Sequence, residues 1–97
     1  RMMVIRAMSP DVVAVDEIGT GEDIRAIESV VNCGCKLLAT VHGNSMEDMK
    51  QKPLLNRLVE SHVFERYIVL DAKPRAGSVQ AIFDGRGTTL YRREAFL

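Results

Sequence analysis

The chain has no glycine-rich phosphate-binding loop, since none of its 97 residues begins the pattern G-x-x-x-x-G-K-[ST]. This absence excludes a self-contained P-loop nucleotide site, because that loop supplies the backbone N–H groups that cradle phosphates. Neither charge is in excess, with 13 basic and 13 acidic residues, so no overall field attracts nucleic acid or an acidic membrane. No secretory h-region is present, and no apolar stretch reaches the roughly 18 residues of a membrane span.

Cysteine is scarce, and its spacing does not suit a metal site. Cys33 and Cys35 form a single Cys-Gly-Cys. A structural zinc ion takes about four ligands, and neither a second cysteine pair nor a spaced histidine pair follows. Cysteines this close in sequence seldom bridge, so we expect two buried free thiols in a reducing cytoplasm.

The length and apolar content of the chain set the scale of the fold. With 97 residues and 46% hydrophobic side chains, the chain is one folded domain at most, with a modest core. It begins at Arg1 rather than at a methionine. Residues 1–8 are interpreted as the tail of a helix that stops at Ser9-Pro10. We therefore expect residues 1–97 to be the carboxyl-terminal part of one domain of a longer protein.

Two apolar runs predict a strand–helix–strand unit. Residues 11–16 form a Val-rich run that is typical of a strand buried on both faces. Thr20 and Asp23 approximate a capping box for an amphipathic helix, and Gly34 suits its left-handed cap. The second apolar run covers residues 36–41. This order predicts a right-handed crossover and a parallel strand pair.

The second half of the chain predicts two helices, a strand and a hairpin. Ser45 and Asp48 signal the start of a short helix, and Pro53 suits the first turn of the next one. The second helix carries apolar residues along one face, namely Leu54, Leu55, Leu58 and Val59. A strand is expected at 67–71 and a hairpin at 78–83 and 88–92. The sequence thus favours an α/β fold, a mostly parallel sheet flanked by helices with a terminal β-hairpin.

Two adjacent carboxylates, Asp16 and Glu17, end the first apolar run. The carboxyl ends of parallel strands are where such sheets bind ligands. Neighbouring side chains on a strand point to opposite faces, so the two acids need not share one task. One can face a hydrated magnesium ion while the other reaches a water near a terminal phosphate. The alternative, which the pattern leaves open, is two solvated acids that begin a loop or face a helix dipole.

His42 follows the second predicted strand. A parallel pairing would bring it beside Asp16 and Glu17 at the same edge of the sheet. A neutral imidazole there can hydrogen-bond a phosphate or a water molecule. The alternative is a turn histidine that bonds nearby backbone groups.

Other polar residues are weaker candidates. Thr40, Asn44 and Ser45 flank the histidine and either add polar contacts or cap the following helix. His62 is interpreted as structural. Four arginines are candidates for neutralising a phosphate from a neighbouring subunit, or are solvated surface residues, namely Arg25, Arg66, Arg75 and Arg86.

Four motifs in order carry a family resemblance, namely SPD at 9–11, DEIG at 16–19, ATVHG at 39–43 and VFERYIVL at 63–70. Residues 6–19 (RAMSPDVVAVDEIG) resemble the Walker B region of the type II and type IV secretion and pilus ATPases. Residues 35–43 (CKLLATVHG) are similar to the histidine box of those ATPases, although they usually have Gly-Glu in place of Asp16-Glu17. Together with VFERYIVL at 63–70, these motifs resemble the stage III sporulation protein AA family more closely than they resemble the secretion and pilus ATPases. The resemblance covers nearly the whole chain.

The resemblance implies a RecA-like P-loop ATPase domain, of which residues 1–97 are the carboxyl-terminal half without the Walker A loop. It implies ATP and Mg²⁺ as cofactors, with Asp16 serving the metal through water and Glu17 as the catalytic acid. His42 would be the histidine-box sensor, and Thr40 a further polar contact to the nucleotide. It also implies a hexameric ring at the cytoplasmic, mother-cell face of a membrane channel in endospore formation. The 97 residues alone are expected to be inactive.

Two other functions are compatible with the sequence. In the first, the chain is a non-catalytic module that docks on a channel protein, and the acids are remnants. In the second, it belongs to a nucleic-acid motor. Such a motor needs a basic channel and several aromatic residues, and only one small group near the hairpin fits, namely Arg75, Arg86, Tyr91, Arg92 and Arg93. We therefore expect no direct contact with nucleic acid.

Overall fold

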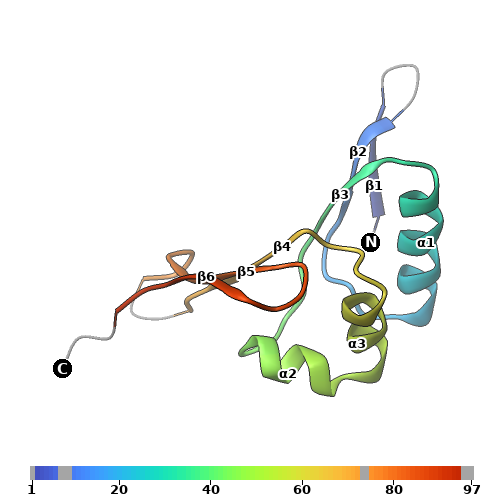
Figure 1. The fold of residues 1–97 in the computed structure, drawn as a ribbon. Coiled ribbons are helices and arrows are strands. Elements are labelled where there is room, and N and C mark those ends of the chain that lie inside the picture. Colours follow the sequence, from blue (N-terminus) through green and yellow to red (C-terminus); the bar gives the residue numbers. More distant parts are fainter. Residues whose placement is uncertain (1, 7–9, 73–74, 95–97) are drawn as a thin grey trace.

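Two three-stranded sheets and three helices make up the fold (Figure 1). The computed structural model describes residues 2–6, 10–72 and 75–94. In chain order the elements are β1 (Met2–Arg6), β2 (Pro10–Val15), α1 (Gly21–Asn32), β3 (Lys36–Ala39), α2 (Met46–Gln51), α3 (Pro53–Glu60), β4 (Arg66–Leu70), β5 (Val79–Asp84) and β6 (Thr89–Arg92). The first sheet has the order β1-β2-β3 and the second the order β4-β5-β6.

The predicted strand–helix–strand unit is confirmed. β2 and β3 run parallel, with Val13 opposite Leu37 and Val15 opposite Ala39, and α1 connects them along one side of the sheet (Figure 1). The two valines are almost completely buried. Gly34, which follows α1, has the left-handed φ of 81° that a glycine adopts without steric cost.

A capping box starts α1, as the sequence predicts. The Thr20 hydroxyl accepts a hydrogen bond from the Asp23 N–H, and the Asp23 carboxylate accepts one from the Thr20 N–H. Ser45 caps α2 in a similar way by accepting from the Asp48 N–H, and Pro53 occupies the first turn of α3. Local sequence signals therefore set the start of all three helices.

One hydrophobic core joins the two sheets and the helices. Its buried side chains come from β2 and the loop after it, from all three helices, and from β4 and β5, namely Val15, Ile18, Ile24, Ile27, Met46, Met49, Leu55, Leu58, Tyr67, Ala81 and Phe83. Leu54 does not belong to this core, because 42% of its surface is exposed. The apolar face predicted for α3 is therefore only partly buried, with Leu55 and Leu58 in the core.

The start of the chain is a strand and not a helix tail. β1 pairs antiparallel with β2, so that Val4 lies opposite Val13. A run of only five residues with Val and Ile does not distinguish helix from strand by periodicity, and the open edge of β2 offers the backbone a pairing partner. Ser9, part of the predicted helix stop, lies outside the described residues.

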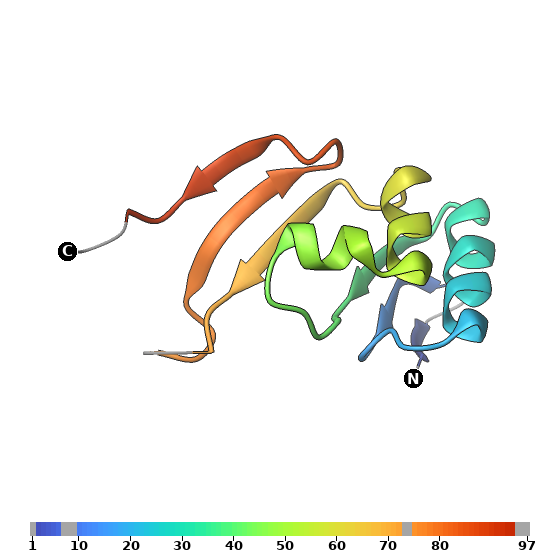
Figure 2. The same ribbon diagram turned by 90° about the horizontal axis from the view of Figure 1, so that it is seen from below.

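The prediction of a mostly parallel sheet is wrong. Among the described strands, only β2 and β3 pair in parallel, and β4, β5 and β6 form an antiparallel sheet of their own. The segment between β4 and β5 is eight residues long (71–78), whereas a parallel connection needs about a dozen or more. The hairpin predicted at 78–83 and 88–92 is confirmed as β5 and β6. Figure 2 shows the second sheet extending away from α1 and β1.

The second sheet has a buried and an exposed face. Tyr67 and Phe83 pair across β4 and β5 and face the core. On the other face, Ile68, Ile82 and Tyr91 lie opposite one another across the three strands. Ile68 is 58% exposed and Tyr91 is 46% exposed, so this apolar row is open to solvent.

Two further expectations concern the cysteines and the membrane. Neither cysteine forms a disulfide, but Cys33 is exposed and Cys35 only half-buried, so the expectation of buried thiols is wrong. Cys33 caps the end of α1 and therefore lies at the surface. Within the described residues, no helix combines the length and the apolar character that a bilayer crossing requires.

Tyr67 offers a test of the packing between the second sheet and the core. Its hydroxyl is buried and has no hydrogen-bond partner in the described part of the chain. Burial of an unpaired hydroxyl is unfavourable, so Tyr67→Phe should raise the free energy of unfolding by about 1 kcal/mol. Chemical denaturation monitored by circular dichroism measures this change. The exposed Tyr91 provides the matched control, and Tyr91→Phe should leave stability unchanged.

The ionisation of Tyr67 also makes the stability of the fold depend on pH. Burial raises the pKa of the Tyr67 hydroxyl above its ordinary value. The unfolded chain therefore loses this proton first as the pH rises, and stability falls above about pH 10. Tyr67→Phe should remove part of that alkaline loss. An equal loss in wild type and variant between neutral pH and pH 11 would contradict the assignment.

Candidate functional site

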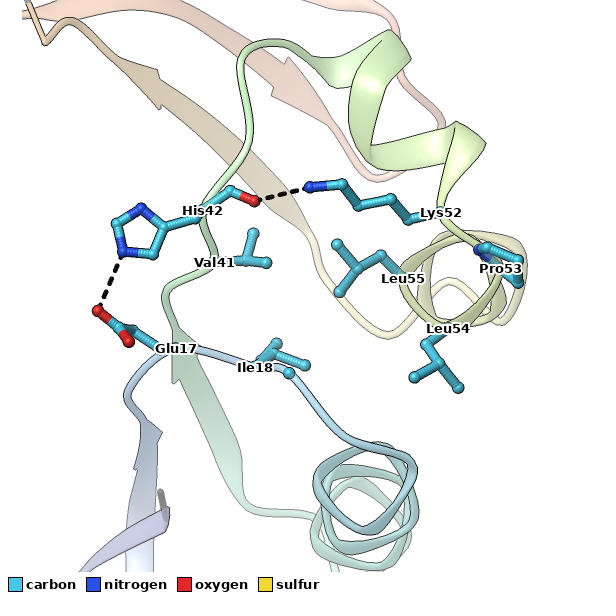
Figure 3. A pocket seen from close by; sticks show the side chains of 9 residues that line it. Glu17, Ile18, Val41, His42, Lys52, Pro53, Leu54 and Leu55 are labelled. Atoms are coloured by element: carbon cyan, nitrogen blue, oxygen red, sulfur yellow. Dashed lines mark hydrogen bonds and ion pairs between the residues drawn. The ribbon is translucent and has the colours of Figure 1, made fainter.

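Glu17 and His42 meet at the carboxyl end of the parallel strand pair. His42 Nε2 lies 3.0 Å from Glu17 Oε1 (Figure 3). Glu17 comes two residues after β2, and His42 comes three residues after β3. The juxtaposition expected from the sequence is therefore present, although β3 ends at Ala39 and not at residue 41. Both side chains are largely exposed, 64% for Glu17 and 89% for His42, so a ligand can reach them.

Thr40 links the two loops that carry this pair. Its hydroxyl oxygen accepts a hydrogen bond from the Glu17 N–H at 2.9 Å and donates one to Asp16 Oδ1 at 3.2 Å. Backbone bonds continue the strand pairing past the ends of the strands, from Thr40 N–H to Val15 O and from Ile18 N–H to Thr40 O. One threonine thus fixes the positions of both acids relative to β3.

The backbone at Glu17 is in the left-handed region, with φ of 57°. A residue with a Cβ adopts this conformation only at a cost of about 1–2 kcal/mol. It also means that Glu17 no longer follows the alternation of β2, so the strand argument for opposite faces does not apply to it. The two acids nevertheless have different contacts, since Asp16 binds Thr40 and Glu17 binds His42.

Asp23 anchors the loop that follows the acids. Its carboxylate accepts hydrogen bonds from the N–H groups of Gly19 and Thr20. These bonds lower the pKa of the Asp23 carboxyl below its ordinary value. Their stabilising contribution is therefore present at neutral pH and is lost as the pH falls through that lowered pKa. The first turn of α1 thus holds the loop between Glu17 and the helix.

A pocket of about 430 Å³ lies beside the pair (Figure 3). Its polar lining is formed by Glu17, His42 and Lys52, and its apolar lining includes Ile18, Val41, Leu54 and Leu55. Figure 3 shows the Glu17 carboxylate and the His42 ring pointing toward each other, away from the apolar wall of the pocket. The partial exposure of Leu54 is explained by its place in this wall.

The remaining predicted residues lie elsewhere or cap helices. Ser45 is the cap of α2. His62 has its Nδ1 3.5 Å from Gly85 O, and it lines a second pocket together with Arg66 and Arg86. Arg25 and Arg75 line neither of these two pockets. The structure therefore groups Asp16, Glu17, Thr40 and His42 and leaves the arginines apart from them.

Lys52 is the site residue that sequence reasoning missed. Its Nζ donates to His42 O at 3.2 Å and lies 3.6 Å from Asp48 Oδ2. The spacing of Asp48 and Lys52, four residues apart across the end of α2, was a readable signal of this ion pair. The contact with His42 O depends on the fold of the 42–45 turn, which no spacing rule gives.

The donor atoms of the site suit a hydrated magnesium ion. Asp16 and Glu17 offer carboxylate oxygens and Thr40 a hydroxyl oxygen, which are hard ligands. Within the described residues, no group of three or more His, Cys, Asp or Glu side chains is placed to hold a metal ion. Mg²⁺ commonly needs only one or two carboxylates, because waters and substrate phosphates complete its shell. These three residues therefore offer hard oxygen donors at one edge of the sheet, which is the ligand class that Mg²⁺ prefers.

Comparisons with known proteins identify relatives in two lineages. The chain is 41% identical over 91 residues to the stage III sporulation protein AA of Bacillus subtilis (strain 168), covering 94% of this chain and 30% of that protein. It is 28% identical over 85 residues to the uncharacterized protein ycf45 of Porphyra purpurea, covering 86% of this chain and 14% of that protein. The chain thus spans less than a third of either relative. No solved structure matches it.

A family model also matches nearly the whole chain. The model described as "Sporulation stage III, protein AA" covers residues 1–90 of the 97. This region contains both strands of the parallel pair, the two loops that carry Glu17 and His42, and the second sheet up to Leu90. The chain therefore belongs to the sporulation stage III protein AA family.

Proposed function

We propose that this chain is the Walker B and histidine-box part of an ATP-hydrolysing ring motor that acts in endospore formation. The observation that carries the proposal is the contact of 3.0 Å between Glu17 and His42 at the carboxyl end of two parallel strands. Open α/β sheets bind their ligands at this edge. The family to which the chain belongs supports the link to sporulation.

In this proposal Glu17 is the general base that orients and polarises the attacking water. A carboxylate that is exposed to solvent and whose backbone N–H is held by Thr40 can hold a water in one position. His42 holds the carboxylate through its Nε2 and reports the state of the terminal phosphate. Mg²⁺, bound near Asp16 with the nucleotide, would neutralise phosphate charge.

The phosphate-binding loop would come from family sequence outside these 97 residues. The ring would be a hexamer with ATP between subunits, and an arginine would act from the neighbouring subunit. It would work on the mother-cell side of the membrane, docked on channel proteins of the sporulation apparatus. RecA-like folding of the complete domain, with β2 and β3 as two of its parallel strands, is part of the same proposal.

A non-catalytic docking module is the second candidate. The observation that favours it is the row of Ile68, Ile82 and Tyr91 on the second sheet, in which Ile68 and Tyr91 are exposed, because exposed apolar patches mark interaction sites. In that case a full-length family member would bind nucleotide and assemble on its partner but would not hydrolyse ATP. A hydrolysis assay therefore separates the two candidates.

Replacement of Glu17 tests the catalytic role. In a full-length family member that carries these 97 residues, Glu17→Gln should lower kcat for ATP hydrolysis by about a hundredfold or more, because the amide cannot accept a proton from water. Phosphate release at saturating ATP measures the effect. Glu22→Gln is the matched control, since Glu22 is an exposed acid in the first turn of α1. Unchanged turnover in Glu17→Gln would exclude Glu17 as the base.

Replacement of Thr40 tests the coupling between the two acids. Thr40→Val removes the hydroxyl that binds both Asp16 and the Glu17 backbone but keeps the shape of the side chain. We expect kcat to fall by up to about a hundredfold, the range known for small misplacements of a reacting group. Thr40→Ser, which keeps the hydroxyl, should restore most of the activity. Equal activity of the valine and serine variants would show that the hydroxyl has no part in positioning.

A further inference from the structure

The turn that carries His42 is held at both of its ends. On the side of β3, Thr40 donates its N–H to Val15 O and accepts the Ile18 N–H at its carbonyl oxygen. On the side of α2, the Asn44 N–H donates to Asp48 Oδ2 at 3.2 Å. His42 lies between these anchors and makes its contact with Glu17 from the middle of the turn.

Lys52 completes this support from the junction of α2 and α3. Its ammonium group lies 3.6 Å from Asp48 Oδ2 and donates a hydrogen bond of 3.2 Å to the carbonyl oxygen of His42 (Figure 3). Asp48 Oδ2 thus contacts both Asn44 N–H and the lysine. The lysine is the C-cap of α2 and the N-cap of α3, so the backbone on both sides of it belongs to helices that contribute to the core.

The chemistry of lysine suits this arrangement. An ammonium group has three donors and can serve a carboxylate and a carbonyl oxygen at once. The Lys52 and Asp48 side chains are 47% and 33% exposed, so they are partly shielded from solvent. The interaction between two exposed side chains such as Glu17 and His42 stabilises their geometry by only about 0–1 kcal/mol. Its geometry must therefore be set by the backbone that carries it.

We propose that Lys52 is a positioning residue, which fixes the turn at His42 and thereby holds the imidazole against Glu17. The contact at the His42 carbonyl restrains the peptide plane that follows His42, and with it the backbone from which the imidazole projects. Through this bond, the junction of α2 and α3 controls the geometry of the Glu17–His42 pair. The geometric claim concerns the chain itself, and only its effect on turnover rests on the proposed function.

The test measures the imidazole of His42 directly by NMR in the 97-residue chain. Glu17→Gln should shift the ring ¹⁵N resonances of His42, because Glu17 Oε1 contacts Nε2. In a chain with Lys52→Met, the same Glu17→Gln change should shift them little or not at all. Methionine keeps the apolar length of the side chain and removes its donors. His62, which lines the other pocket, serves as the internal reference.

Two matched variants separate positioning from general destabilisation. Lys52→Arg keeps a cationic donor and should restore the response of His42 to Glu17→Gln. Lys50→Met removes another lysine from α2 and should leave the response as in the unsubstituted chain. The proposal is overturned if Lys52→Met preserves the full response, if Lys50→Met abolishes it equally, or if the unsubstituted chain shows no response.

Activity gives a second and independent measurement. In a full-length family member, Lys52→Met should lower kcat for ATP hydrolysis by on the order of tenfold to a hundredfold, with recovery in Lys52→Arg. If that protein hydrolyses no ATP while the NMR response depends on Lys52, the proposed function fails and the positioning role stands. If ATP hydrolysis is normal and the NMR response ignores Lys52, the positioning role fails alone.

Discussion

The parallel pairing of β2 and β3 is the constraint on which the rest of the structure depends. Its register places Val15 beside Ala39, and two further backbone bonds carry the pairing on to Thr40 and Ile18. A parallel pair needs a crossover, and α1 provides it. As a consequence, two loops that lie 25 residues apart in sequence leave the sheet at the same edge. A change of register by one residue would separate Glu17 from His42.

The candidate site is polar and exposed, but buried apolar side chains hold the two loops that carry it. Ile18 in the first loop is 7% exposed, and Met46 and Met49 at the base of the second loop are also buried. Loops positioned by a rigid scaffold commonly carry functional residues, because the loop supplies the chemistry and the scaffold supplies the precision. Here the precision depends on a few hydrogen bonds, above all those of Thr40 and Lys52.

Local signals in the sequence predict the local structure well and the pairing of distant strands poorly. The caps at Thr20 and Ser45 and the proline at the start of α3 depend on residues within one turn, and each is confirmed. The meeting of Glu17 and His42 was also predictable, because strand order alone implies it. The separate antiparallel sheet was missed, since an apolar strand such as β4 does not encode its partner. Lys52 was missed because its acceptor is a backbone carbonyl, which no residue type reveals.

At Glu17, the left-handed backbone conformation lowers the stability of the fold, whereas the carboxylate side chain serves the proposed chemistry. Glycine adopts a φ of 57° without the steric penalty that a side chain incurs. Selection for stability alone would therefore favour glycine here, at the end of β2. Under the proposed function, Glu17 keeps its carboxylate in a conformation that disfavours it because the side chain is needed for catalysis. Sequences of this family that have lost the task should be free to drift toward glycine at position 17.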